Sequence, residues 1–334
     1  MKEVNHMDEN ELFKQVQKAV ENPPLILVGS EGSAPYGLPS MKELGNYLKA
    51  TLDPKYSADY YWNSFIEDLE SGQDLESALS NKTLNDESID DIKTETWKLI
   101  SDKDFKLFDE VVFTKKELSI GRLIKKFYQT SSKCVNVLTT NYDRVIEYAC
   151  DSAGLPIYNG YCGLYTKHFN HDFQKRNAVN IVKVHGSLDT FRDVHGETIG
   201  IPMLRELRPG LTPEIITPGL SKYQYVLKGN IREMLHEADQ LIDEANSFLC
   251  IGYGFNDGHI QEKIITKINQ GTPIVVITMK LSDKAAHLIN EKSNHSIIIE
   301  KGGAPDSSTF IVNGKISELA GTFWSIDGFM SIIG

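Results

Sequence analysis

Two polar residues that follow apolar runs are the strongest candidates for chemistry in this sequence. Asn141 lies in the run TTNYD, and His185 lies in the run KVHGS. A side-chain amide offers both a hydrogen-bond donor and an acceptor, so it can orient hydroxyl groups or a water molecule. An imidazole, with an unperturbed pKa of about 6.5, can act as a general base toward water or a hydroxyl group near neutral pH. The pair therefore indicates a site that holds a ligand by its hydroxyl groups and activates water.

Two glycine-rich runs also follow apolar stretches. The run GSEGSAPYG begins at Gly29, and the run GYGFNDGH begins at Gly252. A turn without bulky Cβ atoms lets phosphate groups approach backbone N–H groups, as in the first βα turn of a nucleotide-binding sheet. We therefore expect Gly29, Ser33 and Gly252 to contact phosphate or sugar groups through backbone N–H groups or a hydroxyl group.

The elements that must position these runs alternate between strands and helices. Short apolar runs predict buried strands at residues 25–28, 135–138, 181–184, 248–251, 274–277 and 297–299. We expect residues 297–299 to be the last strand of the sheet. Apolar residues at helical spacing predict helices near residues 60–80, 120–127, 145–150, 224–246 and 260–268. This alternation implies an α/β fold with a doubly wound parallel sheet, whose strands open their carboxyl ends on one edge. Because all four runs follow strands, we expect them to be neighbours at that edge.

The sheet is predicted to form the core of a single domain that spans residues 1–334. We assign residues 24–53 and 111–300 to this Rossmann-like core, and residues 54–110 to an acidic α-helical insertion or small lobe. The insertion holds 15 acidic and 6 basic side chains, which favours a solvated helical face over a docking surface for a basic partner. Residues 190–219 are rich in Pro, Gly and Arg and predict an irregular lid or lobe connection.

Composition and charge exclude several classes of protein. The chain has 334 residues, of which 40% are hydrophobic and 24% charged, as in ordinary soluble globular proteins. No stretch approaches the roughly 20 apolar residues of a membrane span, and the N-terminus has no signal-peptide core, so we expect a cytoplasmic protein without membrane contact. The net charge of -11 argues against direct binding to nucleic acid. The four cysteines form no CxxC pair and the histidines have no metal-binding spacing, so we expect structural cysteines and no metal.

Each candidate residue also has a structural explanation. Asn141 and Asp143 are placed to cap the helix that follows them. A single histidine before a glycine is more often a loop residue with satisfied hydrogen bonds than a catalyst. Asp257 is placed equally well to cap a helix before Gly258 and to contact a bound nucleotide. The functional interpretation therefore depends on all four runs meeting at one edge of the sheet.

Together the runs resemble the signatures of the sirtuin superfamily, in the same order, over roughly residues 24–280. The Gly-Ala-Gly-x-Ser and Gly-Ile-Pro segments of sirtuins are similar to the stretch from Gly29 through Ser33 to Pro39. The Thr-Gln-Asn-x-Asp signature is similar to TTNYD, and the His-Gly signature is similar to the end of KVHGS. The Gly-Thr-Ser strand end is similar to the run that begins at Gly252.

Three departures from the sirtuin signatures restrict the resemblance to one branch of the superfamily. Glu31 stands in the glycine-rich run, near where a pyrophosphate would lie, and Thr140 replaces a Gln. The four-cysteine zinc module of deacylating sirtuins is missing. These features resemble the divergent sirtuin-like proteins of bacterial anti-phage defence, many of which hydrolyse NAD. The segment FIEDLESGQDLESAL, at residues 65–79, also resembles that branch.

The resemblance implies an NAD glycohydrolase that cleaves NAD to nicotinamide and ADP-ribose and depletes it during infection. Nicotinamide leaves C1' of its ribose as a neutral molecule, so positioning and electrostatics supply most of the rate. The resemblance implies that Asn141 and His185 are catalytic and that Asp143 binds the nicotinamide carboxamide. It also implies that Tyr253 and Asp257 belong to the NAD-binding site.

Two other functions remain open. An NAD-dependent protein deacylase would keep the roles of Asn141 and His185 but needs a peptide cleft between two lobes. A non-catalytic sensor would only bind NAD or ADP-ribose. A hydrolase must be silent in healthy cells, so we expect control by homo-oligomerisation or by a partner, and the resemblance indicates a HerA-type DNA-translocating ATPase. We expect weak activity of the chain alone.

Overall fold

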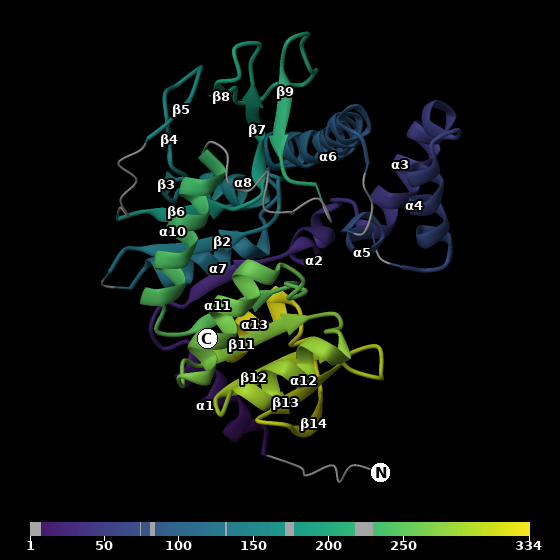
Figure 1. Ribbon diagram of the computed structural model, residues 1–334. Coiled ribbons are helices and arrows are strands. Elements are labelled where there is room, and N and C mark those ends of the chain that lie inside the picture. Colours follow the sequence, from purple (N-terminus) through teal and green to yellow (C-terminus); the bar gives the residue numbers. More distant parts are fainter. Residues whose placement is uncertain (1–7, 74, 81–83, 131, 171–176, 218–229) are drawn as a thin grey trace.

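A nine-stranded sheet runs through the molecule and is covered by helices on both faces (Figure 1). The computed structural model describes residues 8–73, 75–80, 84–130, 132–170, 177–217 and 230–334. Seven neighbouring strands of the sheet are parallel, and two antiparallel strands close one edge. The predicted α/β fold with a doubly wound parallel sheet is confirmed.

The strand order of the sheet reverses at its centre. In spatial order the strands are β3 (Ile157–Tyr158), β6 (Val179–Lys183), β2 (Val135–Thr139), β1 (Leu25–Val28), β10 (Phe248–Ile251), β11 (Ile274–Thr278), β12 (Ser296–Lys301), β13 (Ser307–Val312) and β14 (Lys315–Ala320). From β1 the chain first builds the sheet through β2 toward β6, and it later returns to place β10 on the other side of β1. The crevice beyond the carboxyl ends of β1 and β10 is therefore the topological switch point, where open α/β sheets bind ligands.

The interpretation of residues 297–299 as the last strand was wrong, because the sheet continues through β13 and β14 to Ala320. These two strands alternate buried and partly exposed residues and contain Ser, Thr, Lys and Glu. Antiparallel strands near an edge need only one apolar face, so they lack the continuous apolar run that reveals a central parallel strand.

Alternating side chains of the central strands feed two separate cores. Ile26 and Val28 pack with the helices of one face, whereas Leu25 and Leu27 pack with those of the other. The first face carries α1 (Glu9–Ala19), α7 (Ser119–Tyr128), α8 (Val145–Ser152) and α13 (Ile326–Ile333). The second face carries α10 (Asn230–Glu244), α11 (Gly258–Asn269) and α12 (Asp283–Lys292). Burial on both faces explains why these strands are mostly apolar.

The chain between β1 and α7 forms a helical group beside the sheet (Figure 1). Its helices are α3 (Met41–Tyr56), α4 (Tyr60–Glu70), α5 (Leu75–Ser80) and α6 (Asp86–Thr114). They enclose a core of their own around Trp62 and Phe65, both fully buried. Helix α6 also reaches the rest of the molecule, since the indole of Trp97 donates a hydrogen bond to the carbonyl of Leu188 at 2.9 Å. The helical stretch begins at Met41, earlier than the expected residue 54.

A small antiparallel sheet lies beyond the carboxyl ends of β2 and β6. Its strands are β7 (Gly186–Arg192), β8 (Thr198–Gly200) and β9 (Thr212–Ile215), and a two-stranded ribbon of β4 (Tyr161–Cys162) and β5 (His168–Phe169) lies nearby. The prediction of irregular structure at residues 190–219 was wrong for the end of β7 and for β8 and β9, because tertiary pairing overrides weak local preferences in short strands. Residues 193–197 and 201–211 form no strand or helix, as predicted. Residues 218–219 of that stretch, and residues 224–229 of the predicted helix 224–246, lie outside the described residues.

Two further sequence-based expectations concern membranes and cysteines. Within the described part of the chain, no helix is long and apolar enough to cross a bilayer.

Cys150 and Cys250 are fully buried in the two cores, where burial raises the pKa of each thiol. Both behave as small apolar side chains, as expected for structural cysteines.

Candidate active site

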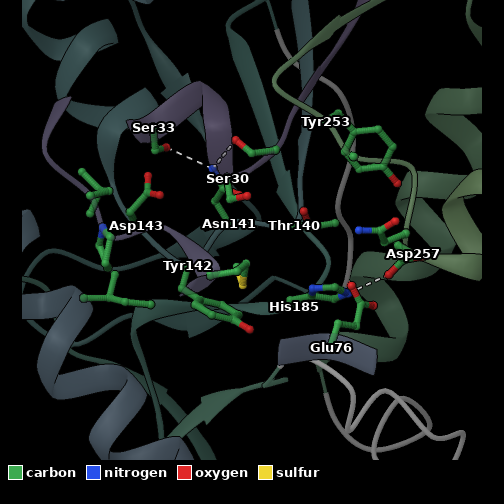
Figure 2. Close-up of a pocket in the computed structure, with 17 residues that line it drawn as sticks. Ser30, Ser33, Glu76, Thr140, Asn141, Tyr142, Asp143, His185, Tyr253 and Asp257 are labelled. Carbon is green, nitrogen blue, oxygen red and sulfur yellow. Dashed lines mark hydrogen bonds and ion pairs between the residues drawn. The ribbon is translucent and has the colours of Figure 1, made fainter. Parts of the chain in front are cut away.

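A single cavity of about 870 Å³ lies at the carboxyl ends of β1, β2, β6 and β10, and we call it the inner cavity. Figure 2 shows Ser33, Asn141 and Asp143 on one side of it and His185, Tyr253 and Asp257 on the other. Gly29 also lines it, whereas the remaining candidate, Gly252, lines an adjoining outer cavity. The structure thus brings seven of the eight candidate residues to one cavity at the switch point.

Gly29 and Gly252 allow β1 and β10 to approach each other closely where both strands end. A Cβ atom on Gly29 would lie 2.4 Å from the carbonyl oxygen of Gly252. A Cβ atom on Gly252 would lie 2.3 Å from the amide nitrogen of Gly32, and the φ angle of +54° at Gly252 also favours glycine. Their own N–H groups donate to Ile251 and Ile277 at 3.0 and 2.9 Å. Both glycines therefore allow the close packing of the ends of β1 and β10. Both of their N–H groups already have acceptors within the protein.

The run that begins at Gly29 forms a helical turn rather than an open glycine loop. Gly29 precedes the short helix α2 (Ser30–Ser33), which continues as a 3₁₀ turn (Ala34–Tyr36). This geometry places the Ser33 hydroxyl against the end of β2, where it accepts a hydrogen bond from the Asn141 amide at 3.0 Å. Ser33 is buried, so it links two strand ends inside the molecule.

Asn141 is held by three hydrogen bonds at the end of β2. Its Nδ2 donates to the Gly29 carbonyl at 2.9 Å and to Ser33 Oγ, and its backbone N–H donates to Thr139 Oγ1 at 3.0 Å. Thr139 Oγ1 in turn donates to the Val28 carbonyl at 2.7 Å. Because a carbonyl only accepts, the nitrogen of the amide must face Gly29. Both N–H groups of the Asn141 side chain donate to protein atoms. Asn141 can therefore offer a ligand only its Oδ1 acceptor, although the sequence led us to expect a donor as well.

Asp143 is a buried carboxyl group on the same wall. Burial raises its pKa to about 6, while the nearby charge of Lys183 opposes the rise and that of Asp104 adds to it. Its Oδ1 accepts the N–H of Val145, the first residue of α8, at 3.1 Å, although the N-cap position of α8 is Arg144 and makes no side-chain cap. Asp143 therefore lines the inner cavity with a carboxyl group that changes protonation near neutral pH.

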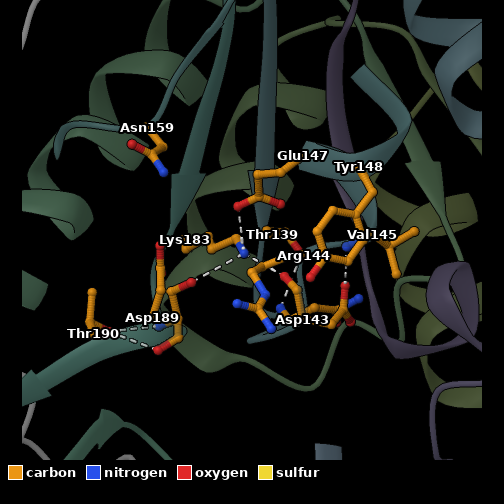
Figure 3. Close-up of polar contacts among 12 residues, drawn as sticks. Thr139, Asp143, Arg144, Val145, Glu147, Tyr148, Asn159, Lys183, Asp189 and Thr190 are labelled. Carbon is orange, nitrogen blue, oxygen red and sulfur yellow. Dashed lines mark hydrogen bonds and ion pairs between the residues drawn. The ribbon is translucent and has the colours of Figure 1, made fainter. Parts of the chain in front are cut away.

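A buried ion pair between Arg144 and Asp104 anchors the segment that carries Asn141 and Asp143, and Figure 3 shows the contacts of Lys183 on its other side. The Arg144 guanidinium donates to Asp104 Oδ2 on α6 at 2.6 and 2.9 Å, and its backbone N–H donates to Oδ1 at 2.8 Å. The Tyr148 hydroxyl adds a fourth contact to Asp104 at 2.6 Å. On the opposite side, Lys183 pairs with Glu147 at 2.7 Å and also donates to the backbone carbonyl of Asp143. The segment is thus fixed between the helical group and β6.

His185 and Asp257 form a close pair across the other side of the inner cavity. His185 Nε2 lies 2.7 Å from Asp257 Oδ2, and the other carboxylate oxygen accepts the N–H of Ile260 at 2.9 Å. Burial opposes ionisation of Asp257, but the hydrogen bond and charge of His185 outweigh it and hold its pKa below the usual value. Asp257 is therefore both the N-cap of α11 and the hydrogen-bond partner of His185, so it has a second role besides capping.

Tyr253 covers the cavity from the end of β10. Its ring packs edge-on against Phe255, with centroids 4.9 Å apart. Its buried hydroxyl has no hydrogen-bond partner among the described residues. Burial, reinforced by the charge of Asp257, raises its pKa, so the hydroxyl stays protonated. Tyr253 therefore supplies mainly an apolar wall.

Sequence reasoning missed three polar residues that line the inner cavity, namely Ser30, Glu76 and Asn256. Glu76 comes from α5 in the helical group, and Figure 2 shows it beside His185 and Asp257. The only sequence signal for Glu76 was its place in the segment 65–79, which resembled one branch of sirtuin-like proteins. Asn256 stands between two candidate residues in GYGFNDGH, but its type alone did not distinguish it.

Glu31 points toward the end of β11 and lines the outer cavity. Its carboxylate accepts a hydrogen bond from Thr278 Oγ1 at 2.6 Å. The outer cavity measures about 1610 Å³ and shares Ser30, Glu76 and Tyr253 with the inner one, so the two adjoin along the switch point. Glu31 and Lys280 thus line the outer cavity, whereas Asn141 lines the inner one. Among the described residues, no group of three His, Cys, Asp or Glu side chains is placed to hold a metal ion.

Comparison with known proteins relates these features to one family. Residues 135–298, from β2 into β12, match the family model of the SIR2-like domain. No curated protein sequence matches the chain. A solved structure from a study of the mechanism and regulation of Sir2 enzymes is 14% identical, with a TM-score of 0.45 over 87% of this chain and 92% of that chain. A Sir2 homologue mutant in complex with ADP-ribose is 14% identical, with a TM-score of 0.46 over 87% and 90% of the two chains. Asn141, Asp143, His185 and Asp257 all lie within the stretch that matches the SIR2-like domain model.

Proposed function

We propose that this protein hydrolyses NAD to nicotinamide and ADP-ribose in the inner cavity. The observation that carries the proposal is the meeting of Asn141, Asp143 and His185 around one cavity at the switch point of a doubly wound sheet. The match of residues 135–298 to the SIR2-like domain supports NAD as the substrate. Hydrolysis, rather than another use of NAD, is the part of the proposal that the experiment below must test.

The two adjoining cavities suit the two halves of a dinucleotide. Dinucleotides bind across the switch point of such sheets, with one nucleotide on each side of the reversal. We place the nicotinamide riboside in the inner cavity, beside Asn141 and His185, and the adenosine in the outer cavity, beside Gly252 and Glu31. The pyrophosphate would then pass between them, close to Ser30, which lines both cavities.

The proposed reaction breaks the bond between C1' of the ribose and the nicotinamide nitrogen. The electron pair of that bond neutralises the pyridinium ring, and the water oxygen bonds to C1' and loses a proton to His185. The Oδ1 of Asn141 would accept a hydrogen bond from the water or a ribose hydroxyl. Asp143 in its ionised form would accept a hydrogen bond from the nicotinamide carboxamide. Such positioning lowers the barrier mainly by fixing the reactants in place before the bond breaks.

Water is favoured over an acyl-lysine as the acceptor. The deacylating sirtuins carry a four-cysteine zinc module between two lobes. In this chain Cys150 and Cys250 are buried in separate cores on opposite faces of the sheet, and Cys134 and Cys162 lie on other elements. The four thiols therefore cannot form one metal site without unfolding the sheet.

An enzyme that consumes NAD must be restrained until it is needed. We propose that the chain acts in the cytoplasm as an anti-phage effector that depletes NAD. We propose control through homo-oligomerisation and through a HerA-type ATPase partner, with weak activity of the chain alone. Robust turnover by the isolated chain would contradict this control.

The activity is tested by incubating the purified chain with NAD, with and without the partner, and following nicotinamide, ADP-ribose and acyl-ADP-ribose by chromatography. Asn141→Ala and His185→Ala are each expected to reduce nicotinamide release by about 100-fold or more, because they remove positioning and general-base groups. His259→Ala is the matched control, since His259 pairs with Asp239 at 3.0 Å on the exposed side of α11. Its activity should equal that of the wild type.

The products separate the possible functions. Absence of NAD loss under every condition would overturn the hydrolase proposal, and tight NAD binding in that case would identify a sensor. Acyl-ADP-ribose formed only with an acyl-lysine peptide would identify a deacylase. Equal rates for the wild type and the His185 variant would remove His185 from the mechanism.

A further inference from the structure

We propose that Asp257 is a positioning residue that fixes the tautomer of His185, so that Nδ1 is the ring nitrogen that accepts the proton. This inference rests on the proposed hydrolysis of NAD. A carboxylate can only accept hydrogen bonds, and Asp257 Oδ2 lies 2.7 Å from His185 Nε2. In the neutral ring the hydrogen must therefore be on Nε2, which leaves the Nδ1 lone pair free to act as the base.

The two oxygens of Asp257 have separate tasks. Oδ1 accepts the Ile260 N–H at 2.9 Å and caps α11, whose Ile260, Ile264 and Ile268 are buried in the core of that face. Oδ2 faces His185. The cap thus ties the carboxylate to a rigid helix, and the imidazole takes its orientation from that helix.

Capping alone does not explain an aspartate at this position. Ser, Thr and Asn cap helices about as well, and each satisfies the cap with one oxygen. The charge and the second oxygen of Asp257 are directed at the imidazole, and the imidazolium that forms when His185 takes a proton is stabilised by that charge. The backbone of His185 is fixed from the other side, because its carbonyl accepts the Ile216 N–H at 2.9 Å.

Two substitutions separate the cap from the positioning role. Asp257→Asn keeps an oxygen for the Ile260 N–H but turns an amide NH₂ toward His185, which forces Nε2 to accept and moves the ring hydrogen to Nδ1. Asp257→Ser keeps the cap with a side chain too short to reach the imidazole. Both variants should fold with Tm values within a few degrees of the wild type, because the cap of α11 is retained.

The tautomer is measured without any reaction, from ¹⁵N NMR spectra of the histidine rings, with His185→Ala used to assign the signals. The wild type should carry its ring hydrogen on Nε2, and Asp257→Asn should carry it on Nδ1. In the NAD assay, both variants should lose about 100-fold or more in kcat while KM stays within a few-fold. Asp239→Asn, at the exposed His259 pair, is the matched control and should change neither quantity.

The outcomes distinguish failure of this inference from failure of the proposed function. A wild-type tautomer with hydrogen on Nδ1, or a kcat of Asp257→Asn within about 3-fold of the wild type, would overturn the inference and leave NAD hydrolysis standing. A wild type that shows the Nε2 tautomer but no NAD turnover would overturn the reaction, and with it the catalytic purpose of the pair. A loss that appears in KM alone would make Asp257 a binding residue and also overturn the inference.

Discussion

Two acid–base pairs hold the elements around the inner cavity, and they differ in burial and in their number of hydrogen bonds. The side chains of Arg144 and Asp104 are 6% and 0% exposed, and Asp104 accepts four hydrogen bonds. The side chains of His185 and Asp257 are 19% and 13% exposed, and a single contact joins them. The first pair joins the segment TTNYD to α6, and the second lines the inner cavity (Figure 2).

This difference separates a pair that holds the structure from a pair that can do chemistry. Guanidinium stays charged at every pH that a protein tolerates, so burial beside the carboxylate of Asp104 makes Arg144 a permanent anchor. Imidazole can act as a general base, and the partial exposure of His185 lets it exchange a proton with water. We therefore expect substitutions at Asp104 to change stability and those at Asp257 to change turnover.

The largest effect on stability is expected at the anchor. Asp104→Ala leaves the buried Arg144 guanidinium without a counter-ion and should lower the free energy of unfolding by about 3–5 kcal/mol. Denaturant unfolding monitored by circular dichroism measures the change. Asp102→Ala, two residues away on α6, is the matched control, because Asp102 and Lys106 form an exposed pair at 2.7 Å and should cost at most about 0.5 kcal/mol. If Asp104→Ala costs no more than the control, or less than Asp257→Asn, the contrast between the two pairs fails.

A smaller, pH-dependent effect is expected at Asp143, which lies between the two pairs. Its pKa rises from about 3.9 when unfolded to about 6 when folded. The folded state thus holds this proton more tightly, and the stability from this group is present below pH ~4 and lost as pH rises through ~6. Asp143→Asn resembles the protonated carboxyl, so it should match the wild type near pH 4 and be more stable by up to about 3 kcal/mol above pH 7.

Urea unfolding at several pH values tests this prediction, with the wild type and Asp143→Asn measured side by side. NAD affinity should show the opposite trend, because the carboxamide prefers the ionised carboxylate. Affinity of the wild type should rise between pH 5 and 7, and affinity of the variant should stay constant across that range. A variant that is less stable than the wild type at pH 7.5 would show that the ionised carboxylate of Asp143 is stabilising.

The smallest effect is expected at Glu31, which belongs to neither pair. Its side chain is exposed and accepts one hydrogen bond, from Thr278, which a glutamine oxygen can also accept. Glu31→Gln should change the free energy of unfolding by less than about 0.5 kcal/mol. It should raise affinity for the anionic dinucleotide a few-fold at low salt and by less at high salt, because the repulsion is screened. Titration calorimetry at two salt concentrations measures the affinity for the dinucleotide. Weaker binding by Glu31→Gln than by the wild type would show that Glu31 contacts the ligand directly.

The sequence alone determined the central sheet and the edge at which the site lies. Buried parallel strands are mostly apolar, so the five central strands β1, β2, β6, β10 and β11 were recognisable from local runs. Since parallel strands all end on one edge, the convergence of TTNYD, KVHGS and GYGFND followed from the order of elements. These inferences needed only local pattern and topology.

The tertiary structure decided which partner each polar group has. His185 and Asp257 are 72 residues apart, and Arg144 and Asp104 are 40 residues apart, so no spacing in the sequence distinguishes the two pairs. The commitment of both Asn141 donors, the turn of Glu31 toward Thr278 and the pairing of β7 with β8 and β9 likewise depend on contacts between distant segments. Burial and hydrogen bonding are properties of the packed chain, and they decide whether a charged residue is an anchor or a base.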